Sequence, residues 1–177
     1  MLKPFGIVVA MVLATVAAKA ATAKQVRLLD GRLSFNTPVD VSHSTHPAKH
    51  SERYSALLDA TSADGGFSVL VTYGQHTVAK PDIAEFMREK VASYTSRSSN
   101  LPHFRWIDHR ITERDGQQWA DICFSHDNDT GAHVYTRCLS CFVDGRLLEI
   151  WALTRRAGDS TQKAYVGRLV DSIHFRS

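Results

Sequence analysis

Residues 104–155 read FRWIDHRITERDGQQWADICFSHDNDTGAHVYTRCLSCFVDGRLLEIWALTR. Apolar and polar residues alternate here in four runs, 104–113, 117–126, 132–143 and 146–155. Asp-Gly pairs stand at 115–116 and 144–145, and such pairs between alternating runs are typical of tight β-hairpins. The stretch therefore predicts a four-strand antiparallel meander.

The segments before and after the meander add one hairpin and two helices. Runs 54–61 and 67–75 flank the turn sequence ADGG at 63–66, and a further strand is expected at 32–36. Apolar residues recur at helical spacing in 81–97 and again from Ser160 to Ile173. Segments 40–51 and 98–102 are polar and are expected to be exposed loops. These elements predict an α+β fold: an antiparallel sheet, made of a hairpin and a four-strand meander, packed against two main helices.

The first 23 residues have the pattern of a cleavable signal peptide. Lys3 precedes an apolar run at 5–16 that is short for a membrane span. Ala21-Thr22-Ala23 matches the A-x-A cleavage pattern, and 18–20 is a second candidate. We therefore expect one α+β domain at 24–177, periplasmic or secreted, with no stable membrane anchor.

The charge balance argues against nucleic-acid binding. Loss of Lys3 and Lys19 with the leader lowers the formal net charge from +3 to +1, whereas nucleic-acid binders usually carry a concentrated basic face. The composition is that of an ordinary globular chain, for which no cofactor is expected.

The three cysteines favour a disulfide, since thiols of exported proteins are usually paired. Strand alternation places Cys123 and Cys138 on the same, more polar side of the predicted meander, and a turn centred near Thr130 brings them roughly opposite each other. We predict a Cys123–Cys138 disulfide and a buried Cys141 thiol. Pairing of Cys138 with Cys141 is the alternative, and their C-x-x-C spacing is less typical of a redox site inside a strand.

Two polar clusters could each form a metal site or an ordinary loop or turn. His43, His46 and His50 could approach one another and offer a soft site for zinc or copper, or they belong to a solvated loop. Asp127 opens an oxygen-rich segment, but a calcium loop starting there would place Ala132 where glycine is required. A hairpin turn explains that segment better.

No catalytic motif stands out in the chain. The sequence contains no G-x-S-x-G elbow, no phosphate-binding glycine loop and no H-E-x-x-H. Trp119 is predicted on the polar side of the meander, where Arg105 or Arg137 nearby would suit a partner-binding surface, although packing within the sheet is the plainer role. We therefore expect a binding protein and not an enzyme.

The order of elements resembles the PsbP and DcrB type of sandwich. The resemblance rests on F-x-x-P at 35–38, the hairpin, the long helix, the meander with Asp-Gly turns, and S-I-x-F at 172–175. It covers nearly the whole mature chain and implies an α/β/α sandwich whose members are mostly non-enzymatic, among them envelope lipoproteins, photosystem accessory proteins, secretion adaptors and small periplasmic immunity proteins. No cysteine lies near the cleavage point, which departs from the lipoprotein members.

The resemblance and the residues together favour a periplasmic immunity-type inhibitor, which would bind and occlude a toxin or effector that acts on the cell envelope. The alternative is an envelope accessory module that binds a metal or a small ligand through the histidine segment 43–50. A hydrolase with a dispersed site is the third hypothesis.

Overall fold

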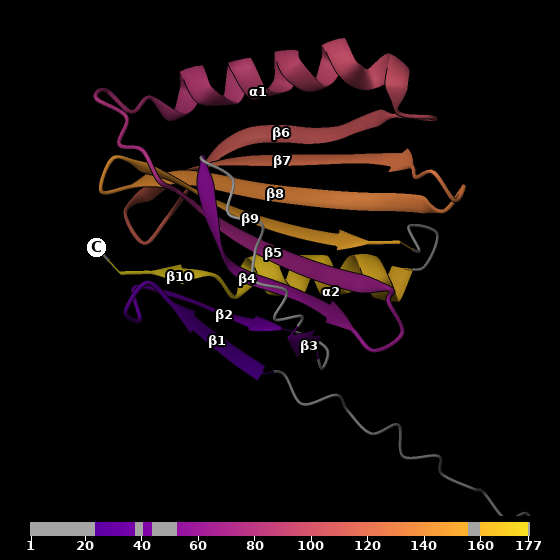
Figure 1. Ribbon diagram of the computed structural model, residues 1–177, viewed down its shortest axis with the longest axis horizontal. Helices are drawn as coiled ribbons and strands as arrows, with labels where there is room; N and C mark the ends of the chain where they lie inside the picture. The colour runs from indigo at the N-terminus through magenta and orange to yellow at the C-terminus, as the bar shows by residue number, and fades with distance from the viewer. Residues whose placement is uncertain (1–23, 38–40, 44–52, 156–159, 177) are drawn as a thin grey trace, which may run out of the picture.

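Two β-sheets and two long helices make up the described part of the chain (Figure 1). The computed structural model describes residues 24–37, 41–43, 53–155 and 160–176. The predicted signal peptide, residues 1–23, lies outside the described residues. Within these ranges, no helix combines the length and the apolar character that crossing a membrane requires.

The strands are β1 (Lys24–Leu28), β2 (Leu33–Thr37), β3 (Val41–His43), β4 (Tyr54–Ser62), β5 (Phe67–Gly74), β6 (Arg105–Arg114), β7 (Gln117–Asp127), β8 (His133–Val143), β9 (Arg146–Thr154) and β10 (His174–Phe175). The helices are α1 (Ile83–Arg97), the short 3-10 helix η1 (Ser98–Asn100) and α2 (Ser160–Asp171).

The large sheet has seven antiparallel strands in the order β3-β4-β5-β9-β8-β7-β6. The predicted meander is confirmed, because β6, β7, β8 and β9 pair in chain order. The predicted hairpin is β4–β5, and β5 joins the meander by pairing with β9 from Phe67↔Thr154 to Tyr73↔Leu148. The long, alternating runs therefore predicted the central part of the fold closely.

A second sheet, with the order β1-β2-β10, lies apart from the large one (Figure 1). Its register places Val26 opposite Phe35, and Phe175 opposite Leu33. Of the three strands of the small sheet, only β2 was predicted. β10 has only two residues, and β3 at the edge of the large sheet has only three, so neither strand is long enough to show a detectable alternation.

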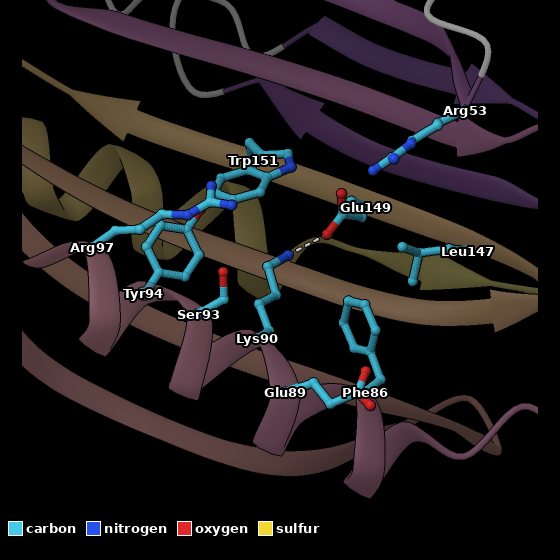
Figure 2. Close-up of a pocket in the computed structure, with 10 residues that line it drawn as sticks. All are labelled: Arg53, Phe86, Glu89, Lys90, Ser93, Tyr94, Arg97, Leu147, Glu149 and Trp151. Carbon is cyan, nitrogen blue, oxygen red and sulfur yellow. Dashed lines mark hydrogen bonds and ion pairs between the residues drawn. The ribbon is translucent and has the colours of Figure 1, made fainter.

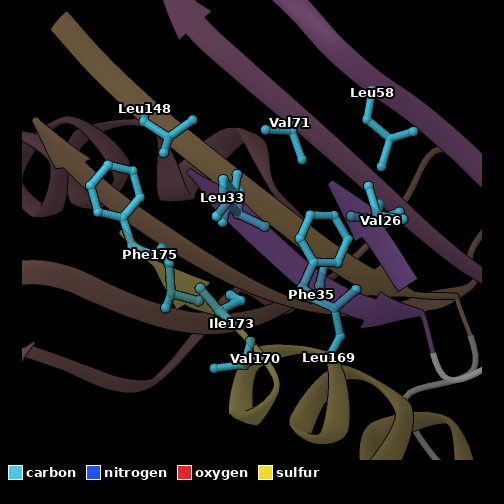
Figure 3. Packing of buried hydrophobic residues seen from close by; sticks show 14 of the residues in the cluster. Val26, Leu33, Phe35, Leu58, Val71, Leu148, Leu169, Val170, Ile173 and Phe175 are labelled. Atoms are coloured by element: carbon cyan, nitrogen blue, oxygen red, sulfur yellow. The ribbon is translucent and has the colours of Figure 1, made fainter. Parts of the chain in front are cut away.

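The main core lies between the large sheet and a layer formed by the small sheet and α2. Figure 3 shows Leu33 and Phe35 of β2, together with Leu169 of α2, among side chains of the large sheet. Leu33 is fully buried, and Phe35 is 1% exposed. The small sheet thus covers part of the hydrophobic core.

Helix α1 packs on the opposite face of the large sheet. The Phe86 ring lies 5.9 Å from the Phe142 ring, and the Tyr94 ring lies 5.0 Å from the Phe124 ring. The helix was predicted from residue 81 and begins at Ile83, because Asp82 is extended and serves as the N-cap. The Asp82 carboxylate accepts hydrogen bonds from the backbone N–H groups of Ala84 and Glu85 at 2.8 and 3.0 Å.

The two Asp-Gly turns allow a matched test of turn packing. Gly116 and Gly145 have φ values of +76° and +71°, but a Cβ on Gly145 would lie 2.7 Å from Thr77 Cγ2, whereas one on Gly116 would meet nothing within 4 Å. We expect Gly116→Ala to cost about 1 kcal/mol of unfolding free energy, because a side chain is unfavourable at positive φ. Gly145→Ala should cost at least about 1 kcal/mol more, since it adds a steric clash. Urea unfolding of both variants measures the difference, and equal losses would contradict it.

Candidate functional site

A cleft of about 540 Å³ lies beside α1, over the face of the large sheet that the core does not use (Figure 2). Alternation along β9 creates both faces: Leu148, Ile150 and Ala152 are buried in the main core, while Leu147, Glu149 and Trp151 face the cleft. The residues that line the cleft are Phe86, Glu89, Lys90, Ser93, Tyr94 and Arg97 from α1, Leu147, Glu149 and Trp151 from β9, and Arg53. The helical residues recur every three or four positions and therefore share one flank of α1.

Lys90 forms the floor of the cleft together with Glu149. The two side chains form an ion pair and are only 11% and 19% exposed. Lys90 Nζ also donates to Ser140 Oγ and to Cys138 Sγ, both at 3.3 Å, and Ser140 Oγ donates to Glu149 Oε1 at 3.2 Å. Each polar group on the floor therefore has a partner, as burial requires.

Aromatic rings enclose the Lys90 ammonium from two sides. Its Nζ lies 4.4 Å from the centre of the Trp151 ring and 5.3 Å from the centre of the Phe86 ring. Ring faces attract cations, and the attraction is stronger where water is excluded. Tyr94 extends the aromatic wall, with its ring centre 6.5 Å from that of Trp151. The floor is therefore preorganised before any ligand enters.

The protonation states on the floor follow from burial and charge. Burial alone would lower the pKa of Lys90, but attraction to the Cys138 thiolate that forms at alkaline pH, and to Glu149, outweighs it, so the pKa is raised and the ammonium stays charged. Burial raises the pKa of the Cys138 thiol to about 11, although Lys90 acts in the opposite direction. At neutral pH Cys138 is therefore a thiol, so Glu149 is the negative group that Lys90 contacts.

The rim of the cleft is more basic than its floor. Arg97 is exposed in the last turn of α1, and Arg53 lines the cleft on the side of the sheet (Figure 2). With Lys90 they outnumber the two lining carboxylates, Glu89 and Glu149. The arrangement suits a ligand that carries negative charge next to apolar surface.

The predicted partner-binding group of Trp119, Arg105 and Arg137 is not a surface patch. Trp119 is fully buried and packs edge-on against Phe175 of the small sheet at 6.4 Å between ring centres. The prediction placed Trp119 on the polar side of the meander, which the small sheet covers, so packing, the plainer of its two predicted roles, is the one observed. Arg137 binds the buried Asp121 through two hydrogen bonds of 2.8 and 2.5 Å, and Arg105 is exposed at the start of β6.

The predicted Cys123–Cys138 disulfide is not formed in the structure. Cys123, Cys138 and Cys141 are all buried free thiols. The β7–β8 register pairs Cys123 with Arg137, and Cys138 with Ile122. The prediction was one residue out of register, and a slip of one residue moves a side chain to the other face of the sheet. Cys138 therefore faces α1, and Cys123 faces away from it.

Of the two predicted polar clusters, the structure describes the second in full and the first only in part. His43 lies on β3, whereas His46 and His50 lie outside the described residues, so the histidine site remains a prediction. Among the residues that the structure describes, no group of three or more His, Cys, Asp or Glu could hold a metal ion. The turn at 127–133 is a hairpin loop, as predicted. Asn128 Oδ1 accepts hydrogen bonds from the backbone N–H groups of Thr130 and Ala132.

The cleft residues were not singled out from the sequence, although two signals were present. Lys90 stands inside the apolar stripe that predicted α1, and Glu149 interrupts the apolar run of the last meander strand. A charged residue on an apolar face needs a partner when it is buried. Their mutual pairing, however, depends on how α1 packs against β9, which local periodicity does not reveal.

The ion pair is expected to stabilise the cleft as a unit. Lys90→Met or Glu149→Leu alone should lower the unfolding free energy by about 3 kcal/mol, because each leaves a buried group without its partner. The double variant Lys90→Met/Glu149→Leu should lose clearly less than the sum of the two. Urea denaturation of the four proteins forms a double-mutant cycle, and simple additivity would show that the pair is not coupled.

The buried thiols predict a loss of stability at alkaline pH. Burial raises the pKa values of Cys123, Cys138 and Cys141 above those of the unfolded chain, so the unfolded state releases these protons first. The unfolding free energy should fall as pH rises from about 8.5, the ordinary thiol pKa, towards about 11. Between about pH 8.5 and about 9.5, where Tyr94 and Tyr135 do not yet add to the effect, we expect Cys141→Ala to reduce this slope by about one third. Thiol titration in denaturant should count three thiols, and a count of one would reveal a disulfide.

Comparison with known proteins identifies the fold. No family profile matches the sequence, and no curated protein matches it. The solution structure of cyanobacterial PsbP (CyanoP) from Synechocystis sp. PCC 6803 superposes with a TM-score of 0.62 at 10% identity, covering 90% of this chain and 96% of that one. LpqN of Mycobacterium tuberculosis, involved in cell envelope biogenesis, gives a TM-score of 0.57 at 12% identity, with 88% and 91% coverage. The Saccharomyces cerevisiae Ran-binding protein Mog1p gives 0.53 at 12% identity, with 88% and 96% coverage. The chain therefore has the PsbP-like α+β sandwich fold that its order of elements predicts.

Proposed function

We propose that this chain is an exported binding protein that holds a segment of a protein partner in the cleft beside α1. The observation that carries the proposal is the preorganised floor, where Lys90 is held by Glu149 between Trp151 and Phe86. A site whose groups are already ordered loses less entropy on binding. Aromatic and arginine side chains, which this cleft offers at its wall and rim, dominate the energetics of many interfaces.

In this proposal the protein binds its partner without catalysing a reaction. A buried cysteine or lysine can act as a nucleophile when its pKa is lowered. Here the pKa of Lys90 and that of Cys138 are both raised, which keeps the amine and the thiol protonated at neutral pH. Both groups are better suited to fixing the shape of the floor than to attacking a substrate.

The finer form of the proposal is an immunity-type inhibitor that occludes an effector in the cell envelope. The predicted signal peptide supports a site of action outside the cytoplasm. Proteins of this fold include a Ran-binding protein and a protein of envelope biogenesis, so binding and accessory roles are represented among them. The excess of basic groups around the cleft favours an effector that presents an acidic side chain beside an apolar one.

A small-ligand accessory role is the second candidate, because the cleft volume of about 540 Å³ lies in the range of small-molecule sites. Native mass spectrometry of the purified protein distinguishes the two candidates, since a retained ligand adds a fixed mass.

Charge reversal at the rim tests the partner site. We expect calorimetry to show that Arg97→Glu weakens binding of the purified product of the neighbouring gene at least about tenfold, because the variant opposes an acidic partner group. Arg97 is exposed, so the variant should fold normally. Arg27→Glu on β1, in the small sheet, is the matched control and should bind like the unchanged protein.

Two results would contradict the proposal. Equal affinity of the Arg97→Glu and Arg27→Glu variants would move the binding site away from the cleft. An absence of binding to any neighbouring gene product, together with unchanged sensitivity of cells that lack this protein, would reject the immunity form.

A further inference from the structure

Strand β6 forms an edge of the large sheet and is long and exposed. Within the described ranges it pairs only with β7, so its outer side has no strand neighbour. Ile107 and Ile111 on this strand are 52% and 39% exposed, and both are among the exposed large apolar side chains of the molecule. An exposed edge of ten residues offers a row of free backbone groups to another strand.

The hairpin geometry shows which backbone groups of β6 face outward. The two-residue turn at Asp115-Gly116 makes Arg114 and Gln117 a hydrogen-bonded pair. Hydrogen-bonded and non-hydrogen-bonded pairs alternate along an antiparallel ladder. The N–H and C=O groups of Glu113, Ile111 and His109 are therefore directed away from β7. A β-bulge at Ile107 ends this regular stretch, which spans 108–114.

We propose that two copies of this chain dimerise by antiparallel pairing of β6 with β6, about a twofold axis at Ile111. This register places Ile111 opposite Ile111, His109 opposite Glu113, Arg110 opposite Thr112, and Asp108 opposite Arg114. Two apolar residues thus meet at the axis, and no like charges face each other. Opposite-charge and apolar pairs are the cross-strand contacts that stabilise sheets.

The neighbouring symmetric registers are less favourable. An axis at Arg110 would place Arg110 opposite its own copy, and an axis at Thr112 would place Arg110 opposite Arg114. Like charges directly opposite each other destabilise a ladder. An axis at His109 would place the bulged Ile107 in the ladder, where pairing is disrupted. Only the axis at Ile111 combines the full regular stretch with complementary charge.

Arg114 adds a second observation. Its Nη1 donates to the backbone oxygen of Val170 at 2.9 Å, while its Nε is buried and has no hydrogen-bond partner among the described residues. Asp108 of a second copy would bring a carboxylate to this guanidinium, whose charge the Val170 carbonyl does not neutralise. Within one chain the Asp108 side chain is 48% exposed and contacts Arg110 at 3.2 Å. Its exposure leaves it accessible to Arg114 of a second copy.

The dimer is compatible with the cleft and does not depend on it. A twofold axis normal to the sheet keeps α1 of both copies on the same face, and the cleft lies towards β9, on the other side of β7 and β8. Two large sheets would join into one, with both clefts open on the same side. Symmetric pairing of one patch with itself is the commonest way in which proteins form dimers.

Site-specific cross-linking tests both the dimer and its register. Under mild oxidation, Ile111→Cys should form a disulfide-linked dimer, because residue 111 meets its own copy at the axis within bridging distance. His109→Cys is the matched control and should remain monomeric on a denaturing gel, since residue 109 faces 113. The unchanged protein controls for the buried native thiols.

Sedimentation of the unmodified mature protein provides the second measurement. We expect concentration-dependent dimerisation with a dissociation constant below about 1 mM, the weak end of the affinity scale. Ile111→Lys should raise the dimer dissociation constant at least tenfold, whereas Val78→Lys, at an equally exposed residue off β6, should not. A monomer throughout this range, equal effects of the two lysine variants, or preferential cross-linking of His109→Cys would each overturn the proposal.

Discussion

The alternation of side chains along β9 is the constraint on which the rest of this structure depends. One set of β9 side chains, Leu148, Ile150 and Ala152, closes the hydrophobic core against the small sheet and α2. The other set, Leu147, Glu149 and Trp151, forms the sheet side of the cleft. Because alternate residues of a strand must point to opposite faces, the core and the cleft share one register. A shift of β9 by one residue would bury Glu149 in the core and remove both features.

Helix α1 is attached to the sheet by a mixture of apolar and charged contacts. Ile83 is its one buried residue among those whose burial is described, and Phe86 and Tyr94 reach the sheet through ring contacts. The Lys90–Glu149 ion pair adds a contact that depends on how the two side chains are oriented and on their charges. A buried ion pair contributes little net stability compared with apolar packing, but it defines one arrangement of the groups that form it. The helix therefore leaves one flank open beside β9, and that flank becomes the wall of the cleft.

The same rule explains why the cysteine prediction failed. The prediction took Cys138 to lie roughly opposite Cys123, which needs a turn centred between Thr130 and Gly131. The five-residue loop between β7 and β8 is centred on Thr130 itself and places Arg137 opposite Cys123. The loop is organised by Asn128, whose side chain accepts several hydrogen bonds, and this geometry sets the register. One residue of difference separates the two thiols onto opposite faces. Trp119 has the packing role and not the partner-binding one, because the small sheet covers the polar side of the meander on which it was placed.

By itself, the sequence determined the elements whose signals are local. Asp-Gly turns, strand alternation and helical spacing were sufficient for the meander, the hairpin, the two helices and the PsbP-like order, because each signal arises from neighbouring residues. The tertiary structure alone decided which sheet face is covered, the exact β7–β8 register, the short strands β1, β3 and β10, and the meeting of Lys90 with Glu149. Alternation divides a strand into two faces, but only packing between distant segments decides which face becomes the core and which becomes a binding surface.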